Sequence, residues 1–270
     1  MTHQTDAPRP RRGDVADSYN RGVDAYEALW SPVILPPAVG LIRHLELSGA
    51  GLVVDIGAGT GALLGVIRAA APAARTVALD ASAEMLQVAR ARREVSAILA
   101  DALALPLANA SADAVILAYV LFHLADPVHA LAEAARVLRP GGRAGIITWA
   151  WERAPRASAV WDQILAEAGV PQGPLRQADT GLDRPDALTA TLRSAGLRPQ
   201  RIWPERLRRQ WDRSSFLELA SGGAANRVRL SLVDAATRKD ALARLRLGLE
   251  RLAPEDLLWE GEVICAAASR

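Results

Sequence analysis

Short apolar runs alternate with amphipathic stretches through the first half of the chain. The runs predict buried strands at residues 52–56, 76–80, 96–101, 113–120 and 143–150. Apolar positions at helical spacing predict helices at residues 62–71, 83–93 and 128–138, the second of them opened by Ser82. Strands that alternate with helices predict a parallel, doubly wound α/β sheet covered on both faces.

The two ends of the chain follow other patterns. Residues 1–14 predict a disordered tail, and residues 15–47 predict two helical pieces separated at Ser31-Pro32 and Pro36-Pro37, because Pro does not continue a helix. After a stretch rich in Pro, Gly and polar residues (151–184), the pattern predicts a helix at 185–196, a strand around 198–211, mostly helix over 214–252 and a strand at 261–269. We expect helical lids at 15–50 and, inserted into the last strands, within 151–270.

The stretch VVDIGAGTGAL (residues 53–63) joins the first predicted strand to the first helix, and it contains Gly57, Gly59 and Gly61. Gly is used where a Cβ would obstruct a ligand or a left-handed turn. A strand, a Gly-rich turn and a helix direct backbone N–H groups toward a polar or anionic group of a ligand. Gly57-x-Gly59-x-x-Ala62, with Asp80 ending the second strand, also fits a dinucleotide fingerprint, so a nicotinamide or flavin enzyme stays open on this motif.

Further motifs follow this turn in order. Asp55 and Gly61 extend it to D-x-G-x-G-x-G, and Asp101 ends the third strand ahead of ALALPL. With VALDASAEML, ADALALPLANASADAV, LFHLADP and RVLRPGG, residues 50–150 resemble the class I S-adenosylmethionine-dependent methyltransferases, in particular the group that includes the ubiquinone and menaquinone biosynthesis methyltransferases. The resemblance implies a Rossmann-like, mostly parallel seven-stranded sheet whose last strand is antiparallel, with the S-adenosylmethionine-binding core at 51–150.

The resemblance also implies how the cofactor S-adenosylmethionine would be bound. The backbone of the three glycines would approach its methionine end, and Asp55 would help to hold its ammonium group. Asp80 would accept hydrogen bonds from both ribose hydroxyls. Asp101 would accept from the adenine amine, and Ala102 would donate a backbone N–H to the ring. An Asp at a strand end is also a common helix N-cap, so that alternative stays open for Asp80 and Asp101.

Four more side chains are cofactor-binding candidates by the same resemblance. Ala81 and Met85 would lie on either side of the adenine, although Met85 fits an ordinary core position equally well. Tyr119 lies near the end of the fourth predicted strand, and Tyr19 corresponds to an aromatic residue that closes over the cofactor. The alternative for Tyr19 is a helical stripe in which it packs with Val23, Tyr26 and Trp30.

Methyl transfer from a sulfonium is an in-line displacement to which the enzyme contributes alignment and, for a protonated nucleophile, a general base. In an open α/β sheet it would occur at the carboxyl ends of the strands, just after the fourth strand. His123 lies there and is the catalytic candidate, because a His with its usual pKa of about 6.5 accepts a proton at neutral pH. Its alternative role is to shape the turn. Trp151 is the substrate-binding candidate, or an anchor for the following loop.

Composition and charge exclude several other classes. A chain of 270 residues with 50% hydrophobic residues can bury a sizeable core, and a net charge of +2 with dispersed Arg does not indicate a nucleic-acid partner. One cysteine, Cys265, excludes a disulfide framework and a multi-cysteine zinc site, and we expect no metal. The polar start and the lack of an apolar run of ~20 residues predict a cytoplasmic protein with no signal peptide or membrane span.

The sequence therefore predicts an S-adenosylmethionine-dependent methyltransferase that acts on the O, C or N atom of a small molecule. Seven Trp against two Phe would suit a flat aromatic or polyketide-like acceptor. One alternative is a protein of this fold that binds the cofactor but serves a non-methylating reaction. The other is a nicotinamide oxidoreductase, which Gly61 and Asp101 disfavour. The identity of the acceptor and the oligomeric state, a homodimer included, stay open.

Overall fold

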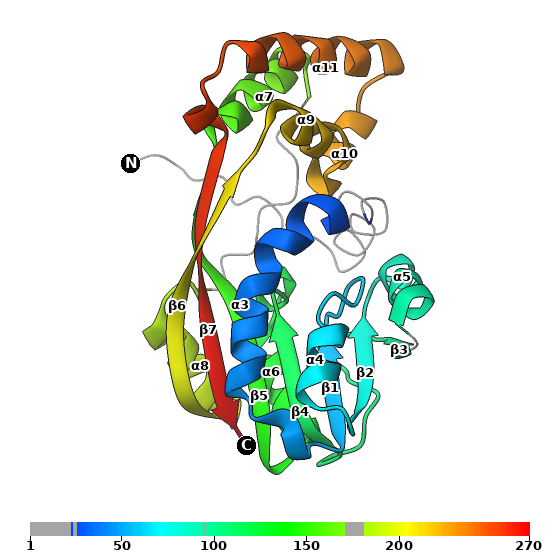
Figure 1. The fold of residues 1–270 in the computed structure, drawn as a ribbon, viewed down its shortest axis with the longest axis vertical. Coiled ribbons are helices and arrows are strands. Elements are labelled where there is room, and N and C mark those ends of the chain that lie inside the picture. The colour runs from blue at the N-terminus through cyan, green and yellow to red at the C-terminus, as the bar shows by residue number, and fades with distance from the viewer. Residues whose placement is uncertain (1–22, 24–25, 94, 171–180) are drawn as a thin grey trace.

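The computed structural model describes residues 23, 26–93, 95–170 and 181–270. Its sheet contains seven strands in the order β3-β2-β1-β4-β5-β7-β6 (Figure 1). The strands are β1 Leu52–Ile56, β2 Arg75–Asp80, β3 Ser96–Leu99, β4 Ala112–Ala118, β5 Leu138–Arg153, β6 Arg198–Gln210 and β7 Leu258–Ser269. Neighbours from β3 to β5 are parallel, whereas β7 is antiparallel to both β5 and β6. The predicted mostly parallel sheet with an antiparallel last strand is confirmed.

Helices cover both faces of this sheet. One face carries α3 Ser31–His44, α4 Leu64–Ala70 and α5 Ala83–Arg93, and the other carries α6 Pro127–Val137 and α8 Pro185–Ser194. Val53 and Val54 of β1 belong to the two separate cores, since successive side chains of a strand point to opposite faces. A strand buried on both faces needs a continuous apolar run, which is the pattern that the sequence shows here.

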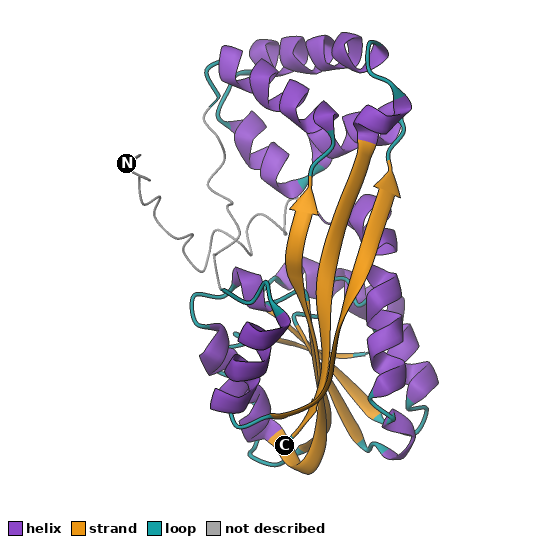
Figure 2. Cartoon of the chain, turned by 90° about the vertical axis from the view of Figure 1, so that its left-hand side faces the viewer, coloured by secondary structure: helices purple, strands orange, loops and turns teal. Residues whose placement is uncertain are grey.

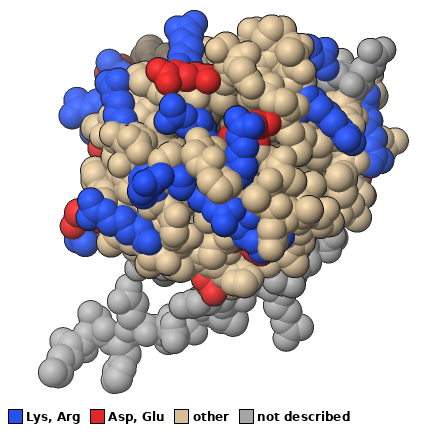
Figure 3. All heavy atoms as spheres, turned by 90° about the horizontal axis from the view of Figure 1, so that it is seen from below, with Lys and Arg blue, Asp and Glu red and all other residues tan. Residues whose placement is uncertain are grey.

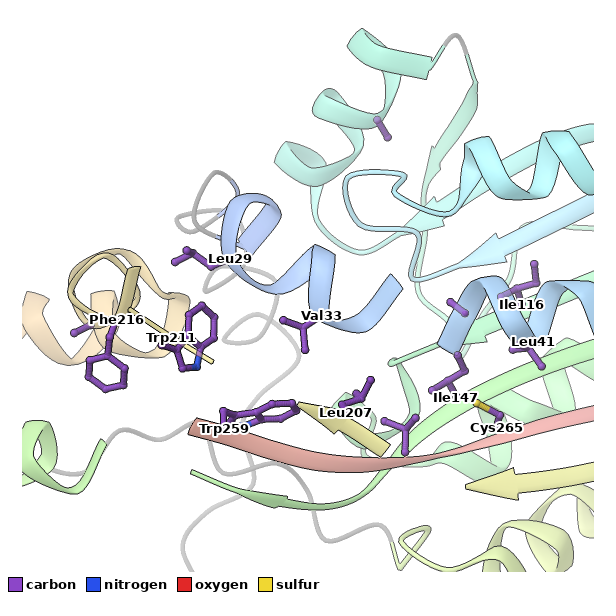
Figure 4. Close-up of a cluster of buried hydrophobic side chains, with 14 of the residues drawn as sticks. Leu29, Val33, Leu41, Ile116, Ile147, Leu207, Trp211, Phe216, Trp259 and Cys265 are labelled. Carbon is purple, nitrogen blue, oxygen red and sulfur yellow. The ribbon is translucent and has the colours of Figure 1, made fainter. Parts of the chain in front are cut away.

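Three strands, β5, β7 and β6, extend beyond the other four and carry a second group of helices at their far ends (Figures 1 and 2). This upper helical group consists of α7 Arg156–Glu167, α9 Arg213–Gly222, α10 Ala224–Ser231 and α11 Ala235–Glu250. Short helical turns lie at η1 Tyr26–Trp30, η2 Leu47–Gly49, η3 Leu121–His123 and η4 Pro254–Leu257. One hydrophobic cluster runs from Leu41 and Ile147 in the lower half to Trp211 and Phe216 in the upper group (Figure 4).

The predicted break at Pro36-Pro37 is wrong, because α3 continues through both residues. The break expected at Ser31-Pro32 is wrong as well, since η1 leads directly into α3 there. Pro32 lies in the first turn of α3, where its missing N–H is least harmful. Pro36 and Pro37 each remove a helical hydrogen bond, but Pro37 and Leu41 are buried against the sheet. Tertiary packing therefore overrides the local preference.

The region after residue 150 contains more structure than its composition indicates. β5 continues to Arg153, and α7 follows within a segment for which the sequence predicted no element. Trp161 and Leu165 of α7 are buried in the large cluster that includes the upper group. The helix predicted at 185–196, the strand around 198–211, the helical segment and the last strand are confirmed as α8, β6, α9 to α11 and β7. The predicted tail at 1–14 lies outside the described residues.

The lower end of the molecule is where β1, β4 and β5 begin. Lys and Arg are more numerous than Asp and Glu on this surface (Figure 3). Arg139 pairs there with Asp113, and Arg143 lies 3.3 Å from Glu46. The carboxyl ends of the parallel strands, where the candidate site is expected, are at the opposite end of the core. Among the described residues, no helix is both long enough and apolar enough to cross a membrane.

Candidate functional site

The turn between β1 and α4 has a backbone conformation that Gly adopts readily and other residues rarely do. The φ angles are 73° at Gly57, 55° at Gly59 and 78° at Gly61. The backbone N–H groups of Gly57 and Ala58 both donate to the carbonyl of Leu79, at 2.7 and 3.0 Å. These bonds fix the turn to the end of β2.

The space around each glycine shows what it is needed for. A Cβ at Gly57 would lie 2.3 Å from Val120 Cγ2, and one at Gly61 would lie 2.6 Å from Leu64 Cδ1. A Cβ at Gly59 would meet no atom of the described residues within 4 Å. Packing therefore requires Gly57 and Gly61, whereas Gly59 faces open space.

A pocket that is partly open to solvent lies over this turn. Ser31, Ile34, Leu35 and Ala38 of α3 form one wall. The opposite wall is formed by the glycine turn, with Asp55 and Thr60, and by Tyr119 at the end of β4. The cavity thus lies between the N-terminal helix and the carboxyl ends of the central strands.

Two polar side chains of this cavity are buried, and each has an oxygen without a hydrogen-bond partner among the described residues. These oxygens are Asp55 Oδ2 and Thr60 Oγ1. Burial, and secondarily the charge of Asp80, raise the pKa of Asp55 to about 7. A buried oxygen without a partner is unfavourable unless a ligand supplies a donor. The cavity therefore suits a ligand that brings a hydrogen-bond donor, above all a cationic one.

Asp80 ends β2, and Asp101 lies two residues after the end of the neighbouring strand β3, at the same edge of the sheet. Asp80 Oδ2 accepts from the Gly59 N–H and Oδ1 from the Ser82 N–H, both at 2.8 Å. Burial raises the pKa of Asp80, and these backbone donors partly oppose the effect. Asp101 Oδ1 accepts from the Leu103 N–H at 2.9 Å. Each carboxylate oxygen has a second lone pair, so both acids can still accept from a ligand.

The remaining cofactor candidates lie around this edge. Ser82 Oγ accepts from the Met85 N–H at 3.1 Å and so caps α5, a role considered for Asp80. The Met85 side chain is buried, Ala81 is exposed, and Ala102 is half-buried. Tyr19 lies outside the described residues.

Tyr119 joins three elements at the cavity. Its φ of 62° is in the left-handed region, which is unfavourable for a residue with a Cβ. The hydroxyl donates to the Ile34 carbonyl of α3 at 3.0 Å, and the backbone N–H donates to the Ile147 carbonyl of β5 at 2.9 Å. Its ring lies 5.4 Å from that of Trp149. Tyr119 therefore holds α3 against the strand ends that line the cavity.

His123 has a weaker basicity than the sequence suggested. It ends η3, and its ring packs 4.1 Å from that of Phe122. Burial lowers the pKa of His123 to about 4, so the imidazole is neutral at pH 7 but a poor proton acceptor. The expectation of an ordinary His pKa is thus corrected. In the described residues, no three His, Cys, Asp or Glu side chains are grouped to hold a metal ion.

Trp151 points away from the face that carries the cavity. A bulge lies in β5 between Trp149, which pairs with Val263, and Trp151, which pairs with Glu262. Directly paired residues of two strands share a face, and Val263 and Glu262 are neighbours on opposite faces. Trp151 is therefore on the other face from Trp149, and its side chain is 44% exposed.

Sequence reasoning missed several residues of this region. Thr60 stands within the quoted glycine motif, and its hydroxyl was a detectable signal. The wall formed by α3 was hidden by the expected helix breaks. An aromatic series was also missed, because its members come from five distant segments: Tyr119, Trp149, Trp259, Trp30 and Trp211.

Known proteins resemble both the site and the fold. Residues 54–146 match a family model described as a methyltransferase domain. An uncharacterized methyltransferase of Mycobacterium tuberculosis is 41% identical over 137 residues, which are 50% of this chain and 54% of the relative. A ubiquinone/menaquinone biosynthesis C-methyltransferase, UbiE, of Syntrophotalea carbinolica is 38% identical over 107 residues, 38% of this chain and 45% of the relative. The chain spans about half the length of these curated relatives.

Some solved structures match almost the whole chain. The crystal structure of the [4+2]-cyclase SpnF has a TM-score of 0.60, covers 97% of this chain and 98% of its own, and is 20% identical. This likeness shows a shared fold. The matched segment 54–146 contains the glycine turn, Asp80 and Asp101. The resemblance seen in the motifs is thereby confirmed over residues 54–146, which are similar to a methyltransferase domain.

Proposed function

We propose that this protein binds S-adenosylmethionine and transfers its methyl group to a small-molecule acceptor. The observation that carries the proposal is the cavity over the glycine turn. Asp55 Oδ2 and Thr60 Oγ1 have no hydrogen-bond partner there among the described residues, and no described atom lies within 4 Å of the Cβ position of Gly59. A ligand with an ammonium group on a slender aliphatic chain fits these requirements. The methionine end of the cofactor is such a group.

The other parts of the cofactor find suitable residues along the same edge. Asp80 would accept from the ribose hydroxyls, with Asp101 and the Ala102 N–H at the adenine. Ala81 and Met85 would lie beside the ring. When bound, S-adenosylmethionine supplies an electrophilic methyl group. This chain contributes binding and orientation, and α3 excludes water from one side of the cavity.

We assign a lid role to the segment that includes α3, and the acceptor-binding role to the part after residue 150. The Tyr119 hydroxyl donates to the Ile34 carbonyl of α3 and would hold this segment over the cavity. His123, with its pKa lowered to about 4, is better suited to shape the turn after β4 than to accept a proton. The methyl transfer would then depend mainly on alignment.

A second candidate keeps the cofactor and changes the reaction. The fold shared with a [4+2]-cyclase shows that this architecture also occurs in a protein named for another reaction. A His that is a weak base is compatible with this alternative too. Methyl transfer to an acceptor is the property that separates the two.

Titration calorimetry with S-adenosylmethionine, S-adenosylhomocysteine and NADH tests the proposal. We expect micromolar binding of the first two and none of NADH. Asp55→Asn should weaken binding of both about tenfold or more, the size of a lost charge-assisted hydrogen bond. Asp186→Asn, at an exposed acid of α8, is the matched control and should bind normally. Binding of NADH alone would contradict the proposal and favour an oxidoreductase.

A further inference from the structure

The connection between β3 and β4 differs from the other connections of the parallel strands. The links from β1 to β2, from β2 to β3 and from β4 to β5 contain α4, α5 and α6. Residues 100–111, the β3–β4 loop, contain only an isolated bridge between Asp101 and Ala104. A crossover between parallel strands is usually a packed helix. In this loop only Leu105 is buried, so apolar packing alone contributes little to holding it in place.

A pair of charged residues on α6 binds this loop. Arg136 Nε lies 2.6 Å from Glu133 Oε1, and Arg136 Nη2 donates to Glu133 Oε2 at 2.8 Å, so the pair is bidentate. The hydrogen bond from Arg136 lowers the pKa of Glu133, which is therefore ionised at neutral pH. Glu133 Oε2 also accepts from the Leu105 N–H at 2.8 Å. The carboxylate thus links α6 to the middle of the loop.

The other donors of Arg136 are directed at the same loop. Nη2 donates to the Leu105 carbonyl at 3.0 Å, and Nη1 donates to the Leu107 carbonyl at 2.8 Å and to Asn109 Oδ1 at 2.7 Å. With the two bonds to Glu133, all five N–H groups of the guanidinium have a partner. Lys has a single nitrogen on a flexible chain and cannot reproduce this set of bonds.

Hydrogen bonds connect this part of the loop to the proposed adenine-binding residues. Asp101 Oδ1 accepts from the Leu103 N–H at 2.9 Å. His129 of α6 donates from Nε2 to the Leu103 carbonyl at 3.0 Å, since a carbonyl can only accept. Leu103 is therefore held between Asp101 and α6, and Leu105 follows two residues later. A displacement of the loop at Leu105 would move the turn that contains Asp101 and Ala102.

We propose that Arg136 and Glu133 are positioning residues that hold Asp101 and Ala102 in place for the adenine of the cofactor, and thereby set the selectivity for adenine. Neither side chain touches the cofactor in this proposal, because both act through the β3–β4 loop. A loop that is ordered before binding spares the ligand part of the entropic cost of ordering it. The inference rests on the proposed function, since it concerns the cofactor of that reaction.

Calorimetry with S-adenosylhomocysteine and S-inosylhomocysteine tests the proposal, because a carbonyl oxygen replaces the adenine amine in the second compound. We expect the unmodified protein to prefer S-adenosylhomocysteine about tenfold or more, since Asp101 can accept from the amine but not from the carbonyl. Arg136→Lys keeps the charge and should reduce the preference to within about threefold. Arg139→Lys is the matched control, because Arg139 pairs with Asp113 at the lower end of the molecule, and it should keep the preference.

The preference distinguishes positioning from a purely structural role, which would weaken the binding of both compounds by the same factor. Three outcomes would overturn the proposal: no preference in the unmodified protein, a full preference in folded Arg136→Lys, or an equal loss in Arg139→Lys. Urea unfolding shows whether each variant is folded. Glu133→Ala is a second variant, in case Arg136→Lys does not fold. It should lose the preference as well, and a full preference in it would also overturn the proposal.

Amide hydrogen exchange provides a readout that needs no ligand. The Leu105 N–H should exchange slowly in the unmodified protein and in Arg139→Lys, because Glu133 accepts from it. It should exchange at least about tenfold faster in Arg136→Lys, in which the carboxylate loses its bidentate partner. Equal exchange rates in the three proteins would contradict the role of Arg136 in holding the loop.

The same samples separate this inference from the proposed function. If the protein binds neither S-adenosylmethionine nor S-adenosylhomocysteine, the proposed function fails and the adenine selectivity fails with it. If it binds both and Arg136→Lys retains the full preference, the proposed function stands and the positioning role of Arg136 is lost.

Discussion

The glycine turn and the upper helical group use the same amino acid, Asp, in opposite ways. At the turn, burial raises the pKa of Asp55 to about 7, and one of its oxygens has no partner among the described residues. In the upper group, Asp212 caps α9 and Asp234 caps α11, each accepting from a backbone N–H at 2.8 Å. Hydrogen bonds lower the pKa of both capping acids.

The difference distinguishes residues held for a ligand from residues held for the fold. Asp55 has a buried oxygen without a partner among the described residues, and Tyr119 has a left-handed φ that is unfavourable for a residue with a Cβ, so both are features that the folded chain alone does not favour. The capping acids satisfy helix ends and are stabilising where they stand. Substitutions in the two regions should therefore affect stability and ligand binding in different proportions.

The largest expected effect is that of Gly57→Ala. A Cβ here meets Val120 Cγ2 at 2.3 Å and requires φ of 73°, so overpacking and the left-handed backbone together should destabilise by about 3–5 kcal/mol. Gly59→Ala adds no such clash and should lose only about 1–2 kcal/mol through its backbone. Urea unfolding of both variants measures the difference. Equal losses would show that the turn relaxes around Val120.

Asp55→Asn should stabilise the ligand-free protein, which would distinguish the acid of the glycine turn from the capping acids of the upper helical group. The folded pKa of about 7 exceeds the ordinary Asp pKa of 3.8, so the unfavourable contribution is absent below about pH 4, grows up to about pH 7 and is constant above it. A shift of about three pKa units corresponds to at most about 4 kcal/mol. We expect a higher unfolding free energy for the variant at pH 8 and a smaller gain at pH 5. A gain that does not depend on pH would rule out this cause.

Asp212→Ala should have the smallest effect on the unfolding free energy, and it should lower that free energy where Asp55→Asn raises it. Loss of the cap, with its reciprocal bond from the Asp212 N–H to Ser215 Oγ, should destabilise by about 1 kcal/mol. Because the folded pKa is lowered, the stabilisation is present at neutral pH and disappears as the pH falls through that pKa. Thermal unfolding at pH 7 and pH 3 measures both. S-adenosylmethionine binding should not change, and a weakened affinity would connect the upper group to the turn.

The glycine turn could be predicted from the sequence because glycine is the residue type that adopts positive φ angles readily. Three positive φ angles need three glycines, and the strand and helix around them follow from apolar spacing. The register of β5 and β7 was not predictable, since the bulge depends on a partner strand more than a hundred residues away. The face of Trp151 could therefore not be assigned from the sequence.

Burial explains the other differences between the sequence predictions and the structure. The pKa of His123 depends on the packing around η3, which no local pattern reveals. The helix through Pro36 and Pro37 is stabilised by its contacts with the sheet, whereas the local rule considers only the missing N–H groups. α7 was hidden in a segment whose composition resembles a loop, although Trp161 and Leu165 are buried.

The strand β7 pairs along its length with both β5 and β6, from the lower core to the upper helical group. The two halves of the molecule therefore share a single set of backbone hydrogen bonds and a single hydrophobic cluster. For protein engineering, the upper half is not an exchangeable module. A transplanted segment would have to reproduce the β5 bulge and the β7 register, or every side chain beyond the junction would face the wrong way.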